Sequence, residues 1–306
     1  MKIYGLIGYP VRHSLSPAMH NAAFAAAKID AQYRLFAIRP IELKKFLLEG
    51  GTSIVDANDQ IVNANDILGF NVTIPHKIAT KEILDKAYPD YYKARSIRNS
   101  WFVQICGAVN TVIKRDTAKY GPVLEYHNTD GLGFCQSLKE DLQFNPKGKK
   151  VLLLGCGGAG RSVVGGLTWS DESVDKIYIY EEDEMTMRII DDHFKAIEDK
   201  FEVISKKLIP EVIGDCSLLV NATPLGMRDG DPSPIDKELL FSNLAVYDVV
   251  YNRQTQLVID ANNKGCRAVT GLGMLLHQGV KAWELWTGIE APIDVMRQSL
   301  KIAMEE

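Results

Sequence analysis

Apolar and polar stretches alternate regularly along residues 1–129 of the chain. The apolar runs "KIYGLIGY", "QYRLFAI" and "ILGFNVTIP" predict strands, and "GAVNTVIKRD" and "PVLEYHNTDG" predict two strand segments around a turn. Helices are expected over residues 17–28, over "PIELKKFLLEG" and from Pro75 to about Lys86. This alternation is typical of a mainly parallel sheet covered by helices. The polar stretch 51–66 has no period and predicts a loop.

A second series of elements begins near Lys149. The stretch "KKVLLLGCGGAGRS" predicts a strand, a glycine turn and a helix start; "KIYIYEED", "CSLLVNATP" and "LAVYDVVYN" predict strands, and "EMTMRIIDDHFKAIEDK" a helix. The chain then closes with two helices, "GLGMLLHQGVKAWELWTG" and "PIDVMRQSLKIAM", without a strand between them. Two such helices pack most economically on the first domain. We therefore expect an α/β protein with a discontinuous domain, 1–129 and 273–306, and a second domain, 130–272.

Composition narrows the function classes. The 306 residues are 46% hydrophobic and 24% charged, which is typical of a globular protein with two domains. A net charge of -4 gives no basic surface for nucleic acid or anionic membrane. No signal peptide and no bilayer-length apolar run is recognisable, so a cytoplasmic protein is expected. The five cysteines are scattered without metal-ligand spacing, which favours small buried side chains in a reducing compartment.

The glycine turn carries the first functional signal. Gly155, Gly157 and Gly160 form the pattern G-x-G-x-x-G between a strand and a helix. In a Rossmann-type domain these glycines allow a tight turn, close approach of a pyrophosphate and close helix–strand packing. The turn, with Gly158 and Ala159 inside it, is therefore expected to bind a dinucleotide. The alternative is a glycine-rich turn that binds nothing.

The end of the next strand bears on which dinucleotide is bound. Glu181 follows Gly160 by 21 residues (181 − 160), close to the spacing of an acid that binds the adenine ribose. Glu182 and Asp183 come next, and a carboxylate cluster would repel a 2′-phosphate. This favours NAD over NADP, although the three acids could instead cap the following helix. Arg161, at the helix start, is expected to face the pyrophosphate.

Further polar residues occur where a plain core would not need them. Thr73 ends a strand, Asn110 interrupts an apolar run, and Gln278 lies on the first closing helix. Such side chains suit a substrate with several hydroxyls, each of which needs a directed partner. Lys77 and Asp130 are the candidate catalytic pair, because a lysine beside a carboxylate can donate a proton to a forming alkoxide. Singly, Lys77 could be solvated, Asp130 could cap a helix and Asn110 could satisfy a turn.

The stretch "HSLSPAMHN" holds two serines just before a helix. Ser16 is expected to be the N-cap, with Pro17 in the first helical position. That assignment leaves Ser14 without a role, whereas two hydroxyls at a helix start could also bind a carboxylate. The histidines nearby, His20 and His76 among them, are expected to be solvated or to cap helices.

Together the motifs resemble one family. "GYPVRHSLSPAMHN", "GFNVTIPHK", "GAVNT", "NTDG", "GCGGAGR", "YDVVY" and "GLGMLLHQG" occur in the order typical of the shikimate dehydrogenase family, including its quinate/shikimate branch. The resemblance implies NAD(P)-dependent, reversible reduction of 3-dehydroshikimate to shikimate in aromatic amino-acid biosynthesis. It also implies an N-terminal substrate domain, completed by the last helices, around a Rossmann-type dinucleotide-binding domain.

The resemblance assigns a role to each candidate residue. It implies that Ser14 and Ser16 bind the substrate carboxylate, and that Lys77 and Asp130 are catalytic. It further implies that Thr73, Asn110 and Gln278 bind the ring hydroxyls and the carbonyl. Tyr251 would close over the substrate, and the backbone of Gly271 would lie near the nicotinamide.

The chain also departs from the family pattern. NADP-using members show an Asn-Arg-Thr-like run where this chain has Glu181, Glu182 and Asp183, so NAD is favoured. The stretches 51–66 and "YPDYYKARSIRNSW" look longer than the family core and are expected to decorate the surface. Two alternatives stay open, a dehydrogenase acting mainly on quinate and a non-catalytic dinucleotide sensor, which would need no Lys77–Asp130 pair. A small-molecule substrate and a monomer or homodimer are expected.

Overall fold

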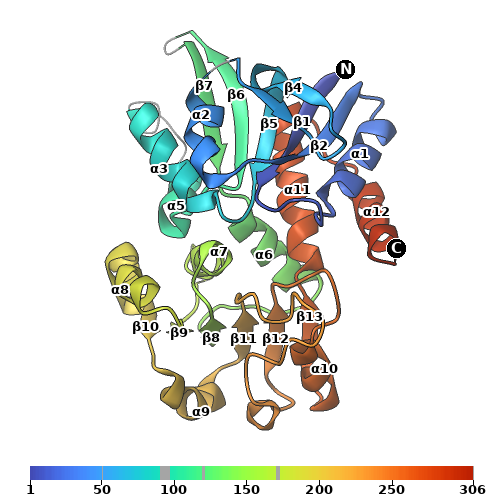
Figure 1. Cartoon of the computed structure of the whole chain (residues 1–306). Coiled ribbons are helices and arrows are strands. Elements are labelled where there is room, and N and C mark those ends of the chain that lie inside the picture. Colours follow the sequence, from blue (N-terminus) through green and yellow to red (C-terminus); the bar gives the residue numbers. More distant parts are fainter. Residues whose placement is uncertain (50, 90–96, 119–120, 170–172, 306) are drawn as a thin grey trace. The chain divides into compact units, whose positions relative to one another are not determined.

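The computed structural model describes residues 1–49, 51–89, 97–118, 121–169 and 173–305. The chain forms two compact units (Figure 1). Unit 1 comprises Met1–Thr129 and Gln278–Glu306, and unit 2 comprises Asp130–His277. The second boundary falls inside helix α11 (Leu272–Thr287), at residue 278 rather than at the expected 273.

Unit 1 is built on a five-stranded sheet in the order β2-β1-β5-β6-β7. The strands are β1 (Lys2–Gly8), β2 (Ala31–Ala37), β5 (Ile67–Val72), β6 (Thr111–Thr117) and β7 (Gly121–His127). β1 pairs in parallel with β2 and β5, whereas β6 is antiparallel to both β5 and β7. Only β6 therefore runs opposite to the other described strands of this sheet, and the expectation of a mainly parallel sheet is confirmed.

Six described helices belong wholly or partly to unit 1. They are α1 (Ser16–Ala26), α2 (Leu43–Leu48), α3 (Lys77–Ala87), α5 (Ile97–Cys106), α11 and α12 (Ile293–Glu305). Of the expected surface stretch "YPDYYKARSIRNSW", residues 90–96 lie outside the described part and residues 97–101 begin α5.

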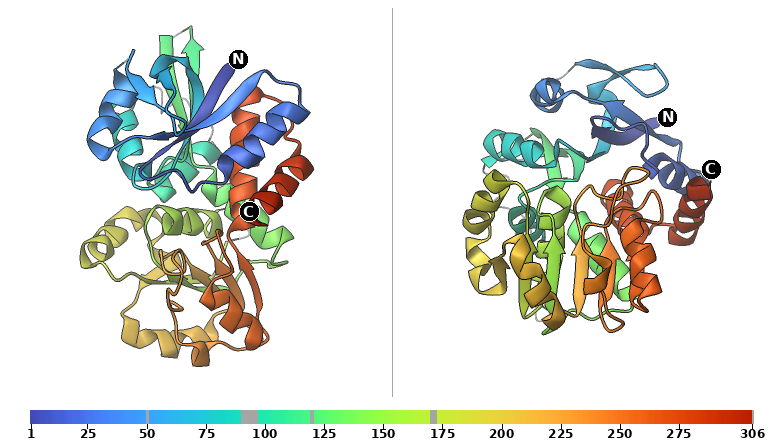
Figure 2. Two further views of the ribbon diagram at one scale, coloured as in Figure 1. Left: turned by 45° about the vertical axis from the view of Figure 1, so that its right-hand side comes forward. Right: turned by 60° about the horizontal axis from the view of Figure 1, so that its bottom comes forward.

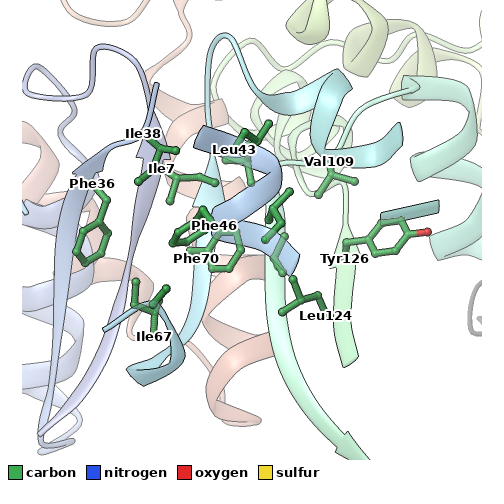
Figure 3. Close-up of a cluster of buried hydrophobic side chains, with 14 of the residues drawn as sticks. Ile7, Phe36, Ile38, Leu43, Phe46, Ile67, Phe70, Val109, Leu124 and Tyr126 are labelled. Atoms are coloured by element: carbon green, nitrogen blue, oxygen red, sulfur yellow. The ribbon is translucent and has the colours of Figure 1, made fainter. Parts of the chain in front are cut away.

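The sheet of unit 1 holds a cluster of buried apolar side chains (Figure 3). Ile7, Phe36 and Phe70 come from β1, β2 and β5, and Phe46 of α2 packs edge-on against Phe70 with 5.2 Å between ring centroids. Burying such side chains supplies most of the free energy that stabilises a domain of this kind.

The C-terminal helices complete unit 1. α1 packs on α12, and Trp286 of α11 donates its Nε1–H to the carbonyl of Val112 at 3.0 Å. A Cβ atom on Gly69 would lie 2.5 Å from the Trp286 ring, so this close approach requires glycine. The end of the chain is therefore an integral part of the first unit.

The stretch 51–66 is not a loop, which corrects the expectation from its polar composition. It forms an antiparallel pair of short strands, β3 (Ser53–Val55) and β4 (Ile61–Asn63), and a 3-10 turn, Ala64–Asp66. Buried Asp56 organises the turn between the strands, because its Oδ1 accepts hydrogen bonds from the amides of Asn58 and Gln60 while Oδ2 pairs with Arg34. The buried carboxylate of Asp56 thus serves a turn and an ion pair rather than solvent.

Unit 2 contains a six-stranded sheet in the order β10-β9-β8-β11-β12-β13 (Figure 1), all of whose pairings are parallel. Numbered within the unit, this order is 3-2-1-4-5-6, the Rossmann arrangement. Figure 2 gives two further views of the ribbon. The strands are β8 (Lys150–Leu154), β9 (Lys176–Tyr180), β10 (Phe201–Val203), β11 (Leu218–Asn221), β12 (Ala245–Asp248) and β13 (Arg267–Thr270).

The connecting helices of unit 2 are α6 (Asp130–Glu140), α7 (Gly158–Leu167), α8 (Glu184–His193), α9 (Ile209–Val212) and α10 (Gln256–Asn263). Apolar side chains from β8, β11, β12 and α10 form a core of their own. The helix expected to continue from α8 ends at His193, and a kinked 3-10 segment, Lys195–Lys200, follows.

None of the described helices is long and apolar enough to cross a membrane. Among the described residues no group of His, Cys, Asp or Glu could hold a metal ion. All five cysteines are free thiols.

Candidate active site

The two serines before α1 divide their roles differently from the expectation. The helix begins at Ser16, its N-cap residue is Leu15, and no side chain caps it from that position. Instead the Ser14 Oγ accepts a hydrogen bond from the Ser16 amide at 3.3 Å. The assignment of Ser16 as N-cap is therefore wrong, and Ser14 is the residue that satisfies a free amide of the first turn. The Ser14 hydroxyl proton is left to donate elsewhere.

Two histidines near these segments are buried, which corrects the expectation that they are solvated or act as caps. His20 stacks on Tyr33 with 4.5 Å between ring centroids, and burial lowers its pKa to about 3. His76 occupies the backbone N-cap position of α3, but its ring lies 2.6 Å from the carbonyl of Ile38 and caps nothing. Both histidines contribute to packing in unit 1.

The carboxyl end of β5 carries a polar cluster. Asn71 is buried and fully engaged: its Oδ1 accepts from the Tyr33 hydroxyl at 2.7 Å, and its Nδ2 donates to Thr111 at 3.0 Å. Thr73, two residues later, is half-buried, and its amide donates to the Ile7 carbonyl at the end of β1. Asn71 therefore has a structural role, whereas the hydroxyl of Thr73, one residue past the end of β5, makes no hydrogen bond within the described part of the chain.

Asn110 and Gln278, 168 positions apart in the chain, meet in unit 1. The Asn110 Nδ2 lies 3.4 Å from the Gln278 Oε1 and 2.9 Å from the Thr129 Oγ1, while the Asn110 Oδ1 accepts from the Thr129 amide at 2.7 Å. Contrary to the expectation, Asn110 lies immediately before β6 rather than inside a strand. Thr129 was missed by sequence reasoning, although its place beside Asp130 in "NTDG" was a usable signal.

Lys77 and Asp130 each begin a helix. Lys77 is the first residue of α3, and its carbonyl accepts a hydrogen bond from the Val109 amide at 2.9 Å, which fixes the segment before Asn110 against the start of α3. Asp130 is buried and is the first residue of α6, directly after Thr129. Because Lys77 belongs to unit 1 and Asp130 to unit 2, the approach of their charged groups stays a prediction.

The three glycines of the turn in unit 2 differ in what surrounds them. Gly155 has φ +85°, a conformation that favours glycine, and a Cβ on Gly160 would lie 2.2 Å from the Gly155 carbonyl oxygen. At Gly157, the N-cap of α7, a Cβ would meet nothing within 4 Å. Two glycines are therefore required by the fold itself, and the third keeps open space at the positive end of a helix, where a pyrophosphate binds.

The acidic run after β9 holds two structural roles. Glu181 accepts hydrogen bonds from three amides, those of Cys156 at 2.8 Å, Glu182 at 2.9 Å and Asp183 at 3.2 Å. Asp183 caps α8, accepting from the amide and hydroxyl of Thr186. The capping alternative is thus confirmed for Asp183, while Glu181 ties the end of β9 to the glycine turn.

Arg161, in the first turns of α7, is a buried cation. Among the described residues no carboxylate pairs with it, and its Nε has no hydrogen-bond partner. Burial raises the pKa of the Cys156 thiol to about 12, and the positive charge of Arg161 acts in the opposite direction by lowering it. A buried guanidinium without a partner fits a site for an anionic group such as a pyrophosphate.

Tyr251 and Gly271 lie in the loops that follow β12 and β13. Tyr251 is half-buried, and burial raises the pKa of its phenol. The Gly271 amide donates to the Val250 carbonyl at 3.1 Å. A Cβ on Gly271 would lie 2.1 Å from the Val249 carbonyl oxygen, so the two loops are in van der Waals contact.

Comparisons with known proteins point to one family. The profile of the shikimate dehydrogenase substrate binding domain matches residues 6–112, and that of the shikimate 5′-dehydrogenase C-terminal domain matches residues 271–301. A relative from Methanopyrus kandleri, named shikimate dehydrogenase (NADP(+)), is 36% identical over 310 aligned positions covering 97% of this chain and 94% of the relative. The chain belongs to the shikimate dehydrogenase family.

Solved structures of the family share the fold. Shikimate 5-dehydrogenase of Thermus thermophilus, in complex with NADP(H) and shikimate, matches with a TM-score of 0.78 and 29% identity over 99% of this chain and 100% of that one. Quinate dehydrogenase of Corynebacterium glutamicum, in complex with NAD, matches with a TM-score of 0.78 and 28% identity over 98% of this chain and 99% of that one. Both the shikimate and the quinate branch of the family are thus represented among its structural neighbours.

Proposed function

We propose that the protein catalyses the reversible, nicotinamide-dinucleotide-dependent interconversion of 3-dehydroshikimate and shikimate. Membership of the shikimate dehydrogenase family supports this, and the single structural observation that carries it is the Asn110–Thr129–Gln278 cluster. That cluster gathers amide and hydroxyl groups from three distant segments, as a substrate with several ring hydroxyls requires. Thr129 is followed directly in the chain by Asp130.

We assign the substrate contacts to unit 1. The Ser14 and Ser16 hydroxyls at the start of α1 bind the ring carboxylate, where the helix N-terminus adds a favourable field. Thr73, Asn110 and Gln278 bind the ring hydroxyls and the carbonyl. The Ser14 Oγ already accepts a hydrogen bond from the Ser16 amide, so the Ser14 hydroxyl proton is the one directed at the carboxylate.

Lys77 and Asp130 are assigned the proton transfer. In the reductive direction, the Lys77 ammonium donates a proton from Nζ to the ketone oxygen as the alcohol forms. The Asp130 carboxylate stabilises that ammonium and orients the hydroxyl product. In the oxidative direction Lys77 takes the proton from the hydroxyl, by microscopic reversibility. Tyr251 is assigned the role of closing over the ring.

Unit 2 supplies the cofactor site, since its glycine turn, the open space at Gly157 and the unpartnered Arg161 all fit a dinucleotide pyrophosphate. Gly155, Gly157, Gly158, Ala159 and Gly160 would hold the pyrophosphate, with Glu181 at the adenine ribose and Gly271 near the nicotinamide. When bound, the nicotinamide supplies or accepts the hydride.

We further infer that NAD is preferred over NADP, although the Methanopyrus kandleri relative is named for NADP(+). Exposed Glu182 and Asp183 follow Glu181 where a 2′-phosphate would have to lie. Uncompensated carboxylates at that point disfavour a second phosphate by Coulomb repulsion. The five free cysteines fit a cytoplasmic enzyme, which we take to be a monomer or homodimer.

A steady-state assay of shikimate and of quinate, each with NAD and with NADP, tests both proposals. We expect shikimate oxidation with a higher kcat/KM for NAD, and a loss of at least about 100-fold in kcat for Lys77→Ala, the usual size of a general acid–base contribution. Lys81→Ala is the matched control, because Lys81 lies one turn further along α3 and pairs with Asp85. Near-normal turnover by Lys77→Ala would remove its assigned role, and equal or better efficiency with NADP would overturn the cofactor preference.

A further inference from the structure

Asp248, the last residue of β12, is a fully buried carboxylate that the proposed mechanism does not use. Its Oδ1 accepts from the Asn221 Nδ2 at 2.9 Å and the Val250 amide at 3.0 Å, and its Oδ2 accepts from the Thr255 Oγ1 at 2.6 Å. Within the described part of the chain no basic side chain pairs with it. Burial raises the pKa of Asp248, and these donors oppose that rise. Keeping a lone carboxylate there costs stability, so a compensating role is expected.

On one side the network reaches the glycine turn. The Asn221 Oδ1 accepts from the amide of Thr223 at 3.1 Å and from its hydroxyl at 2.7 Å. Thr223 in turn lies against Gly155, where a Cβ would come within 2.9 Å of the Thr223 amide nitrogen. The network therefore fixes the position of the loop after β11 relative to the glycine turn that is assigned to the pyrophosphate.

On the other side the network reaches the loops after β12 and β13. Asp248 fixes the Val250 amide, and the Val250 carbonyl accepts from Gly271 at 3.1 Å. Thr255, bound to Asp248, also caps α10 by accepting from the Val258 amide at 3.3 Å. The loop between Asp248 and Thr255, which includes Tyr251, is thus tied down at both of its ends.

We propose that Asp248 is a positioning residue for the cofactor, acting through the Asn221–Asp248–Thr255 network. The network joins the loops that follow β8, β11, β12 and β13 at the carboxyl edge of one parallel sheet, where dinucleotides bind in this fold. A carboxylate suits this role because it accepts from several donors at once, and charge-assisted bonds are roughly twice as strong as neutral ones. The inference rests on the proposed function for the identity of the ligand, a nicotinamide dinucleotide.

The test compares Thr255→Val with Thr255→Ser and Asp248→Asn in the full chain. We expect Thr255→Val to raise the Kd for NADH or NADPH and the cofactor KM about tenfold, the size of one lost hydrogen bond to a charged group. Thr255→Ser keeps the hydroxyl and should restore both. The matched control is Thr168→Val, since the buried Thr168 hydroxyl at the C-cap of α7 donates to the Val164 carbonyl of the same helix rather than to a residue of the network.

Asp248→Asn separates positioning from a purely structural role. Removing a lone buried charge should leave Tm unchanged or raise it, while the misoriented amide fails to accept from Thr255 and weakens cofactor binding. Kd and KM within about twofold of the parent for folded Thr255→Val and Asp248→Asn would overturn the inference, as would equal losses in Thr255→Val and Thr168→Val. Direct titration with the reduced dinucleotide needs no turnover, so failure of the shikimate assay would sink the proposed function without deciding this one.

Discussion

At the scale of single residues, His20 is held in an environment that disfavours its charged form. Its ring is buried between Tyr33 and Trp286, and neither ring nitrogen has a hydrogen-bond partner in the described structure. Burial lowers its pKa to about 3, well below the unperturbed 6.5. The unfolded chain therefore binds a proton between those two pH values that the folded chain does not.

This difference predicts an acid sensitivity that one substitution should remove. Stability contributed by neutral His20 is complete above pH 6.5 and falls by up to about 1.4 kcal/mol per pH unit as the pH drops towards 3. His20→Phe should keep the aromatic packing and flatten the fall in the free energy of unfolding below pH 6.5, measured by urea titration at several pH values. Phe24→Leu, in the same aromatic cluster, should lower stability without changing the pH slope. An unchanged slope in His20→Phe would contradict the prediction.

Residue types and motifs nominated Asn110 and Gln278, and the structure shows how their surroundings differ from those of a third buried amide, Asn71. All three side-chain amides are buried. Asn71 forms its hydrogen bonds with Tyr33 and Thr111, whereas the Nδ2 of Asn110 donates to the Oε1 of Gln278. The partners lie far away in the sequence, so local pattern carries no information on which amide is structural. For the same reason the role of Asp248 could not be predicted from its neighbours in the chain.

At the scale of elements, the turn between β8 and α7 contains glycines that the fold requires and one, Gly157, that we assign to the ligand. We expect Gly160→Ala to destabilise the protein by about 1–3 kcal/mol or more, because the new Cβ would collide with the Gly155 carbonyl. Gly157→Ala meets open space at an ordinary φ of -69° and should change the free energy of unfolding by less than about 1 kcal/mol. Urea titration of the two variants beside the parent measures both changes.

Cofactor binding should show the opposite pattern for Gly157→Ala. Its methyl group would occupy the space left for the pyrophosphate, so a Kd at least about tenfold weaker is expected from calorimetric titration with NADH. A Gly157→Ala protein that binds as tightly as the parent would show that the space serves no ligand.

Among the elements, strands that stand in clear apolar runs were predicted, including the four-residue strands β11 and β12. The short strands β10 and β13 were missed, and so were the helices α5, α6 and α10. β3 and β4 were assigned to a loop because polar residues dominate that stretch. Pairing with a partner strand and an Asp56–Arg34 ion pair stabilise this hairpin, and neither is visible in local periodicity.

At the scale of the whole molecule, the two units depend differently on chain continuity. Unit 2 is one uninterrupted segment, residues 130–277, and it contains all six strands of its sheet, its own core and the glycine turn. Unit 1 needs the end of the chain, because Trp283 packs on Phe24 and Trp286 bonds the carbonyl of Val112. This asymmetry follows from the closing pair of helices, which the sequence already indicated by its lack of an intervening strand.

The asymmetry predicts that the two units behave differently when expressed alone. Residues 130–277 should fold cooperatively and bind NADH, since the hydrogen bond of the glycine turn to Glu181 and its close approach to Thr223 both lie within them. Residues 1–129 should not, because loss of Trp283 and Trp286 exposes the apolar faces of α1 and β6, and truncating one buried aromatic alone costs about 3–5 kcal/mol. Circular dichroism melts and NADH titration of both fragments give the measurement, with Gly157→Ala in the 130–277 fragment as the binding control. A folded 1–129 fragment would show that unit 1 does not need the C-terminal helices. A 130–277 fragment without a melting transition would show that the core of unit 2 does not suffice for folding.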